Sequence, residues 1–204
     1  MTVAALYVMP DGPYYGLDDV EPWGLPERDA RLYAGPWPVV AHPPCERWGR
    51  YWGGAPLTWP RLTKGDDAGC FTAALESVRR WGGVLEHPEG SWAWPFHSLV
   101  RPPRHGGWVA AGDGTGWTCC VEQGHYGHRA RKATWLYVAG KPLPSLLWGS
   151  SGKRERMEDG FHSREERRRA VRTGICKRLS KRARAETPAP FRDLLLSIAE
   201  GVTP

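Results

Sequence analysis

The chain lacks any long apolar segment, and this absence argues against a protein that crosses a membrane through a helix. No run approaches the roughly 20 apolar residues that a transmembrane helix needs. The first residues have no basic flank followed by a long apolar stretch, so we expect no signal peptide and a cytoplasmic location. No membrane partner is expected.

The chain also lacks the cysteine pattern of a secreted disulfide scaffold. Its 5 cysteines are an odd number without the spacing of such a framework, so we expect free thiols in a reducing compartment. Cys119 and Cys120 are followed by His125 and His128, but this spacing is unusual for zinc. We interpret this stretch as a strand that enters the core, and we expect no metal site.

The bulk composition is that of one globular domain. Of the 204 residues, 41% are hydrophobic and 25% are charged, which is ordinary for such a domain. Tryptophan (12), glycine (25) and proline (19) are abundant. We therefore expect long, shaped loops that present flat aromatic side chains.

Positive charge is concentrated in one late segment. The chain has 28 Lys and Arg against 22 Asp and Glu, and residues 151–186 hold 13 of the basic and 6 of the acidic residues. Such a segment attracts polyanions, with phosphate the obvious candidate. Alternatively, it is a solvated, partly disordered arm with no partner. The side chains expected to contact DNA are Arg167, Arg168, Arg169, Lys177, Arg178, Lys181 and Arg182.

Apolar periodicity and turn signals predict an α/β protein. Short apolar runs predict strands over residues 4–8, 38–41, 84–86, 117–122 and 134–139. Helical spacing predicts helices over residues 66–81, capped by Asp66 or Asp67, and 191–200. The alternation favours a Rossmann-like, partly parallel sheet flanked by helices, with ligands at the carboxyl ends of its strands. Irregular structure is expected over residues 10–38, 46–64 and 88–116.

This pattern also predicts how the chain is organised. Residues 1–148 are expected to form a single α/β domain with long loops rich in Trp, Gly and Pro. A basic, partly flexible arm is expected over residues 149–186. Residues 187–204 are expected to carry a C-terminal helix that packs back on the domain.

Cys45 follows two prolines at the end of a predicted strand, in the sequence His42-Pro43-Pro44-Cys45. Prolines fix the backbone and so hold the next side chain in one direction. A thiol at the mouth of a sheet, near Arg or Lys, can have a lowered pKa and act as a nucleophile. Alternatively, Cys45 is a buried structural cysteine.

Glu86 ends another apolar strand and precedes His87 and Pro88. A carboxylate at such a point rarely lies in a core without a partner. It can bind the ring nitrogen and exocyclic amine of a base, or act as a general acid. Alternatively, a nearby Arg neutralises it. His42 and His87 are alternates for proton transfer, although we expect them chiefly to orient loops.

Three basic residues, Arg129, Arg131 and Lys132, follow a Gly-containing turn and precede a predicted strand. Planar guanidinium groups suit a phosphate or the carbonyl oxygen of a pyrimidine. Alternatively, this segment is an exposed basic turn.

Taken in order, these motifs resemble the DNA cytosine-5 methyltransferase family, of which the chain looks like a shortened, phage- or prophage-type member. Pro44-Cys45 is similar to the Pro-Pro-Cys loop of that family, and Glu86 to the Glu of its Glu-Asn-Val strand end. Arg129 or Arg131 is similar to an Arg of its Gln-x-Arg-x-Arg element. The 41 residues from Cys45 to Glu86 and the 43 from Glu86 to Arg129 suit this order.

The resemblance implies a function and a set of roles. Cys45 would add to carbon 6 of a cytosine, Glu86 would hold the flipped base, and Arg129 or Arg131 would hold the ring oxygen or a phosphate. DNA would be the partner, and a base in a duplex must be flipped out. The substrate-binding neighbours would be Pro44, His42, His87, Trp48 and Lys132.

The donor in this family is S-adenosylmethionine, bound by a Phe-x-Gly-x-Gly loop after the first strand. Residues 9–14 do not carry that motif. With 37 residues between Val8 and Cys45, a second cofactor-binding strand with its ribose-binding acid is not expected either. Residues 181–191 also resemble the tail of small proteins encoded by actinobacterial phages and prophages.

Two other functions agree with the sequence, since fold resemblance alone does not transfer function. One is a non-enzymatic nucleic-acid-binding protein, regulatory or anti-defence, on a degenerate methyltransferase scaffold. Its binding would be sensitive to salt and would survive loss of Cys45 or Glu86. The other is an enzyme that modifies pyrimidine nucleotides, which would leave the basic arm unexplained.

Overall fold

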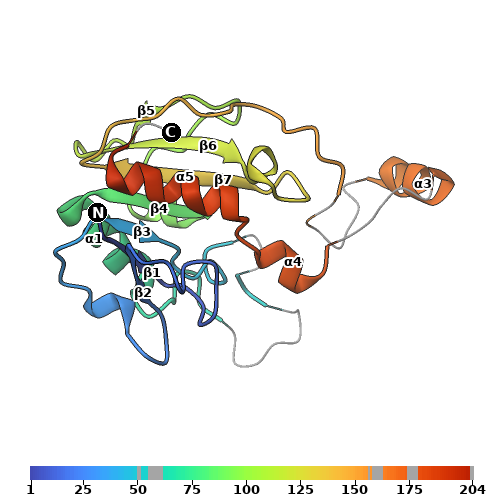
Figure 1. The fold of residues 1–204 in the computed structure, drawn as a ribbon. Helices are drawn as coiled ribbons and strands as arrows, with labels where there is room; N and C mark the ends of the chain where they lie inside the picture. The colour runs from blue at the N-terminus through green and yellow to red at the C-terminus, as the bar shows by residue number, and fades with distance from the viewer. Residues whose placement is uncertain (50–51, 55–61, 156, 158–162, 174–178, 203–204) are drawn as a thin grey trace.

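The computed structural model is an α/β protein built on one seven-stranded mixed sheet (Figure 1). It describes residues 1–49, 52–54, 62–155, 157, 163–173 and 179–202. The sheet has the order β2-β1-β3-β4-β7-β6-β5. Its strands are β1 (Val3–Leu6), β2 (Val20–Trp23), β3 (Val39–Ala41), β4 (Gly83–Pro88), β5 (Val109–Ala110), β6 (Gly116–Glu122) and β7 (Ala133–Ala139). The α/β class predicted from the sequence is confirmed.

The sheet is parallel on one side and antiparallel on the other. Strands β2, β1, β3 and β4 are parallel neighbours, whereas β7 runs antiparallel between β4 and β6, and β5 is antiparallel to β6. The first four strands and β6 therefore end at the same side of the sheet, here termed the carboxyl edge. Strand β1 has β2 on one side and β3 on the other, so the strand order reverses there, and ligands of open α/β sheets bind beside such a reversal.

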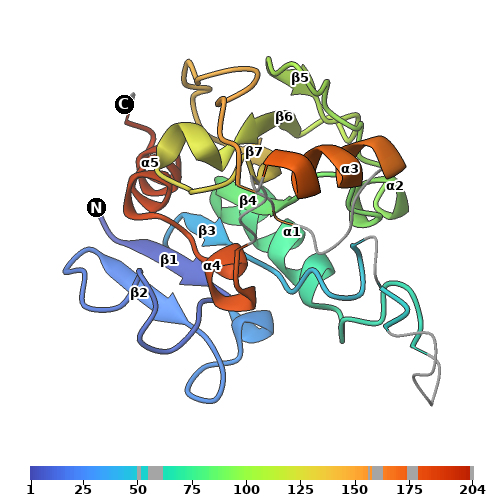
Figure 2. The same cartoon turned by 90° about the vertical axis from the view of Figure 1, so that its right-hand side faces the viewer.

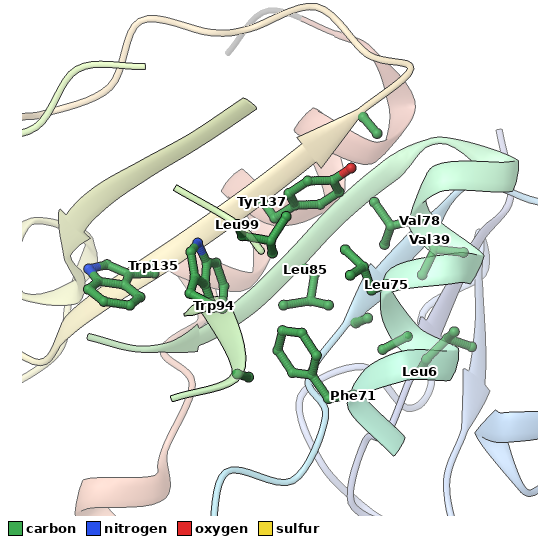
Figure 3. Packing of buried hydrophobic residues seen from close by; sticks show 14 of the residues in the cluster. Leu6, Val39, Phe71, Leu75, Val78, Leu85, Trp94, Leu99, Trp135 and Tyr137 are labelled. Atoms are coloured by element: carbon green, nitrogen blue, oxygen red, sulfur yellow. The ribbon is translucent and has the colours of Figure 1, made fainter. Parts of the chain in front are cut away.

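Helix α1 (Cys70–Trp81) covers one face of the sheet (Figure 3). Phe71, Leu75 and Val78 recur at helical spacing and are buried in one cluster with Val39 and Leu85. The short helix α2 (Ala93–Phe96) closes the far end of this cluster, where its Trp94 ring meets Trp135 at a centroid distance of 5.4 Å. The packing of this layer sets the direction in which the chain continues beyond β3 and β4.

Helix α5 (Ala189–Glu200) covers the opposite face. Its Phe191, Leu195 and Ile198 side chains are buried against Val40 and Val84 of the sheet. The helix begins two residues before the predicted 191–200 because Pro190 is tolerated in a first helical turn. The C-terminal helix thus packs back on the sheet.

Three smaller helical elements surround these layers, and one helix stands apart. The 3₁₀ turns are η1 (Ala30–Leu32) and η2 (Gln123–Tyr126), and the basic segment carries α3 (Arg164–Thr173) and α4 (Lys181–Ala185). Helix α3 projects away from the sheet, whereas α4 lies close to the carboxyl ends of the parallel strands (Figures 1 and 2). No helix in the described ranges is long and apolar enough to span a membrane.

Two expectations about irregular segments were wrong. Strand β2 lies within residues 10–38, and α2 and β5 lie within residues 88–116. Strand β2 escaped prediction because it is a half-buried edge strand that contains Pro22, so it has neither apolar alternation nor full pairing. Strand β2 also shows that the chain between β1 and Cys45 holds one strand besides that predicted over residues 38–41.

Candidate functional site

A polar cluster forms where the α5-facing core ends at the carboxyl edge. His42, Glu86 and Gln123 each lie two residues beyond an apolar residue of that core, namely Val40, Val84 and Val121. Side chains alternate along strands, so these positions share the face that α5 covers. Three neighbouring polar side chains complete the cluster: Tyr14, Thr134 and Lys132.

Hydrogen bonds join these side chains into one chain. His42 Nδ1 lies 3.1 Å from Glu86 Oε2, and His42 Nε2 lies 2.8 Å from the Tyr14 hydroxyl. An ionised carboxylate only accepts, so Nδ1–H donates to it and a neutral ring accepts from Tyr14 at Nε2. Gln123 Nε2 donates to Glu86 Oε1 (3.1 Å) and to Thr134 Oγ1 (2.9 Å). The partner of Glu86 is thus not the Arg considered from sequence.

The Glu86 carboxyl is ionised at neutral pH despite its burial. Burial by itself would raise its pKa, but the hydrogen bond from His42 and the positive charge of Lys132 lower the pKa below its usual value. Each carboxylate oxygen has a second lone pair, so Glu86 can accept a further hydrogen bond from a ligand.

Lys132 is the cation of this cluster. Its backbone has a positive φ of 42°, and its Nζ donates to the Glu186 carbonyl at 2.6 Å. Burial lowers the pKa of its ammonium group, while the negative charges of Glu86 and of a Cys45 thiolate oppose that change. The ammonium therefore acts electrostatically on both groups.

Cys45 lies half-buried beside this cluster with a free thiol. Burial raises the pKa of the thiol, the charge of Glu86 raises it further, and Lys132 only partly offsets them. The lowered pKa that its position suggested is therefore wrong for the unliganded protein, in which Cys45 is a thiol at neutral pH. Attack by its sulfur requires removal of that proton when a substrate arrives.

Arg129 and Arg131 are directed elsewhere. The Arg129 side chain is 62% exposed, and its guanidinium pairs with Glu155 at 3.0 Å. Arg131 is exposed and its Nε donates to the Lys153 carbonyl at 3.4 Å. Both guanidinium groups thus hold the segment that follows residue 149, and the structure brings Lys132 rather than either Arg to Cys45 and Glu86.

His87 is a predicted member that faces the opposite side of the sheet, where α1 lies. Its ring is fully buried between Phe71 and Trp94, at centroid distances of 5.2 and 6.2 Å. Burial lowers its pKa to about 4, so the ring is neutral. Its contacts make His87 part of the core, and it also interacts with the backbone of Pro44, next to Cys45.

Two further predicted substrate-binding residues, Trp48 and Pro44, differ in their exposure to solvent. Trp48 is buried, and its Nε1 donates to Asp67 Oδ2 at 2.7 Å, so its ring supports the loop after Cys45 from inside. Pro44 is exposed beside Cys45. Of the predicted substrate-binding residues, His42, Lys132 and Pro44 therefore lie at the Cys45–Glu86 edge.

Sequence reasoning missed Tyr14, Gln123 and Thr134. The signal for Gln123 was present, because it follows Val121 by two residues as Glu86 follows Val84. No local signal could have found Tyr14, which lies in a loop 28 residues before its partner His42.

The predicted DNA-contacting residues lie on two helices of the basic segment. Arg167, Arg168 and Arg169 are exposed on α3, and Arg182 is exposed on α4. Lys177 and Arg178 lie outside the described residues, as does the side chain of Lys181.

S-adenosylmethionine, the donor that the resemblance implies, does not fit the residues beyond β1 and β2. The Val8 N–H bonds the Trp23 carbonyl, and a Cβ on Gly24 would lie 1.9 Å from the Val8 oxygen, so backbone fills the space between the strand ends. The carboxylates near the end of β2 are engaged as well: Glu21 with Arg28, Glu27 with Tyr15, and Asp29 with Arg31.

Metal binding has no support within the described ranges, where no three or more His, Cys, Asp or Glu side chains form a ligand set. Cys119 and Cys120 are buried on opposite faces of β6. The chain matches no protein-family model, no curated protein and no solved structure.

Proposed function

We propose that the protein modifies a cytosine or a related pyrimidine base in DNA on a Rossmann-like sheet, with Cys45 as its nucleophile. The observation that carries this proposal is that Cys45, ionised Glu86 and Lys132 interact electrostatically near the ends of the parallel strands β3 and β4 and the start of β7. A thiol, a carboxylate and an ammonium are the groups that a pyrimidine ring needs for addition at carbon 6.

The chemistry assigns one task to each group. The Cys45 sulfur forms a bond to carbon 6 as its proton passes to solvent, and the electrons of the 5,6 double bond move to carbon 5, which takes a proton from solvent. Loss of a proton from carbon 5 to solvent then restores the double bond and expels the sulfur as a thiolate, which takes up a proton from solvent. Glu86 accepts a hydrogen bond from the exocyclic amine, and Lys132 donates one to the ring oxygen. The electrophile that carbon 5 accepts in the full reaction is left unassigned, because the S-adenosylmethionine site does not fit.

Exchange of the hydrogen on carbon 5 tests this proposal without any donor. In D₂O, the protein should replace this hydrogen by deuterium in cytosines of an oligonucleotide, measured as a gain of mass. A DNA strand that contains 2-pyrimidinone should form a covalent adduct with Cys45 for the same reason. The Cys45→Ala variant should lose both signals, whereas Cys70→Ser, which removes another half-buried thiol, should keep them.

The results of these experiments distinguish this proposal from the alternative functions. Absence of exchange and of the adduct in the folded wild-type protein would refute nucleophilic attack by Cys45. Exchange in dCMP but not in DNA would move the function to nucleotides.

A non-enzymatic DNA-binding protein is the second candidate, favoured by the protonated Cys45 thiol and by the engaged carboxylates near the end of β2. It predicts DNA binding that falls with salt and is unchanged by Cys45→Ala, together with no carbon 5 exchange.

A further inference from the structure

Around helix α2 the surface exposes aromatic rings that carry positive charges. Trp92 is 43% exposed and Phe96 is 69% exposed. The Lys64 ammonium lies 3.9 Å from the centroid of the Trp92 ring and 5.1 Å from that of Trp52. The Arg101 guanidinium lies 5.6 Å from the Trp92 centroid. These five residues are here termed the aromatic platform.

Backbone hydrogen bonds fix the platform to the Cys45 loop. The Trp92 N–H donates to the Trp48 carbonyl (2.9 Å), and the Trp48 N–H donates to the Cys45 carbonyl (3.0 Å). The exposed Phe96 ring rests on the buried Trp48 ring at a centroid distance of 5.1 Å. Asp67 anchors Trp48 in turn through its indole N–H. The platform is therefore joined through Trp48 to the loop that carries Cys45.

Exposed rings interleaved with cations match a ligand that has flat faces and a negative backbone. An acidic peptide would use Lys64 and Arg101 but would leave the ring faces of Trp92 and Phe96 without a partner. Nucleobases stack on such rings whatever their sequence, while Lys and Arg attract the phosphates. A duplex hides its base faces within its own stack, so only an unpaired strand offers them.

We infer that the aromatic platform binds single-stranded DNA and leads that strand to Cys45. This inference deepens the proposed function and rests on it for the choice of nucleic acid. The protein then acts on bases that are already unpaired, and a duplex is a poor substrate unless a segment of it is opened.

The test compares two tryptophans of nearly equal exposure. Binding of fluorescein-labelled dT20 to the full chain is measured by anisotropy for the wild type, Trp92→Ala and Trp117→Ala. Trp117 is 45% exposed on β6, outside the aromatic platform, and serves as the matched control. Loss of one stacked base should weaken binding by Trp92→Ala roughly 5- to 150-fold, and Trp117→Ala should bind like the wild type. Binding to the dA20·dT20 duplex should be weaker and should not change in Trp92→Ala.

Each outcome bears on the inference by itself. Unchanged binding in folded Trp92→Ala, or an equal loss in Trp117→Ala, would overturn it, as would equal affinity of the wild type for duplex and single strand. Circular dichroism checks folding. Lys64→Gln, which removes the cation without changing the ring, should also weaken dT20 binding, and its thermal transition should be no steeper than that of the wild type. Because this assay does not involve Cys45, a binding result that contradicts the platform, together with intact carbon 5 exchange, refutes the inference alone. Binding that depends on Trp92, together with absence of carbon 5 exchange, refutes the proposed function alone.

Discussion

At the residue scale, two opposite charges control the reactivity of the Cys45 thiol. The charge of Glu86 raises the thiol pKa and the charge of Lys132 lowers it, after burial has raised it most. The thiolate is the reactive form of cysteine. Glu86→Gln should therefore speed alkylation of Cys45 by iodoacetamide at pH 8, and Lys132→Met should slow it, each by severalfold. Peptide mass spectrometry measures the rate at Cys45, with Cys70 as the internal reference. Equal rates in the three proteins would show that neither charge acts on the thiol.

A second residue, His87, makes stability depend on pH. Its pKa is about 4 in the folded protein and near 6.5 when unfolded, so the unfolded state binds more protons between these values. Stability is then complete above pH 6.5 and falls as the pH drops toward 4. Between pH 7 and pH 5 the loss should be about 2 kcal/mol.

Urea unfolding at several pH values measures this loss. His87→Leu, which keeps an apolar side chain of similar size between Phe71 and Trp94, should flatten the dependence in this window. His105→Ala changes an exposed histidine and should leave the dependence as it is. An unchanged slope in His87→Leu would assign the dependence to another group.

At the scale of elements, the start of α1 depends on one carboxylate. Asp67 accepts from the backbone N–H of Gly69 (3.0 Å) and Phe71 (2.8 Å), and also from the indole of Trp48. Asp67→Ala should reduce the free energy of unfolding by about 1–3 kcal/mol, since a cap and a side-chain hydrogen bond are lost together. Asp66→Ala alters an exposed neighbour and should change it by less than about 0.5 kcal/mol. Chemical denaturation compares the two, and equal losses would exclude a specific cap.

The elements with strong apolar patterns were predictable, and the others were not. Strands β1, β3, β4, β6 and β7 and helices α1 and α5 each present a buried face, so their periodicity is visible in the sequence. Strand β2 has no fully buried residue, and its Pro22 argued against a strand. The insertion of β7 between β4 and β6 depends on pairing across the chain, which no local pattern encodes.

The candidate site divides in the same way. Cys45 and Glu86 could be predicted because each lies close to the end of an apolar strand, Cys45 shortly after β3 and Glu86 within β4. The partners of Glu86 could not, since His42 is 44 residues and Gln123 37 residues away in sequence. The two arginines were preferred over Lys132 on chemistry alone, but β7 begins at Ala133 and directs the residue before it toward Glu86.

At the scale of the whole molecule, we expect the proposed affinity for DNA and the folding stability to reside in different parts. Arg167, Arg168 and Arg169 are exposed on α3, which projects from the sheet and contributes nothing to either core cluster (Figure 1). Their replacement by Gln should leave the thermal unfolding midpoint unchanged. If they contact phosphates, the slope of log affinity against log salt for single-stranded DNA should become shallower by about 2, since each contact contributes about 0.7.

Anisotropy titrations of a labelled oligonucleotide at several salt concentrations measure this slope, and calorimetry measures the unfolding midpoint. Arg80→Gln removes an exposed arginine of α1 whose guanidinium lies over Trp81, and it should leave the slope unchanged. A slope that survives the triple replacement would mean that α3 is a solvated arm. The aromatic platform and Lys132 would then provide the contacts to DNA, and the positive charge of α3 would serve only to raise the rate of encounter.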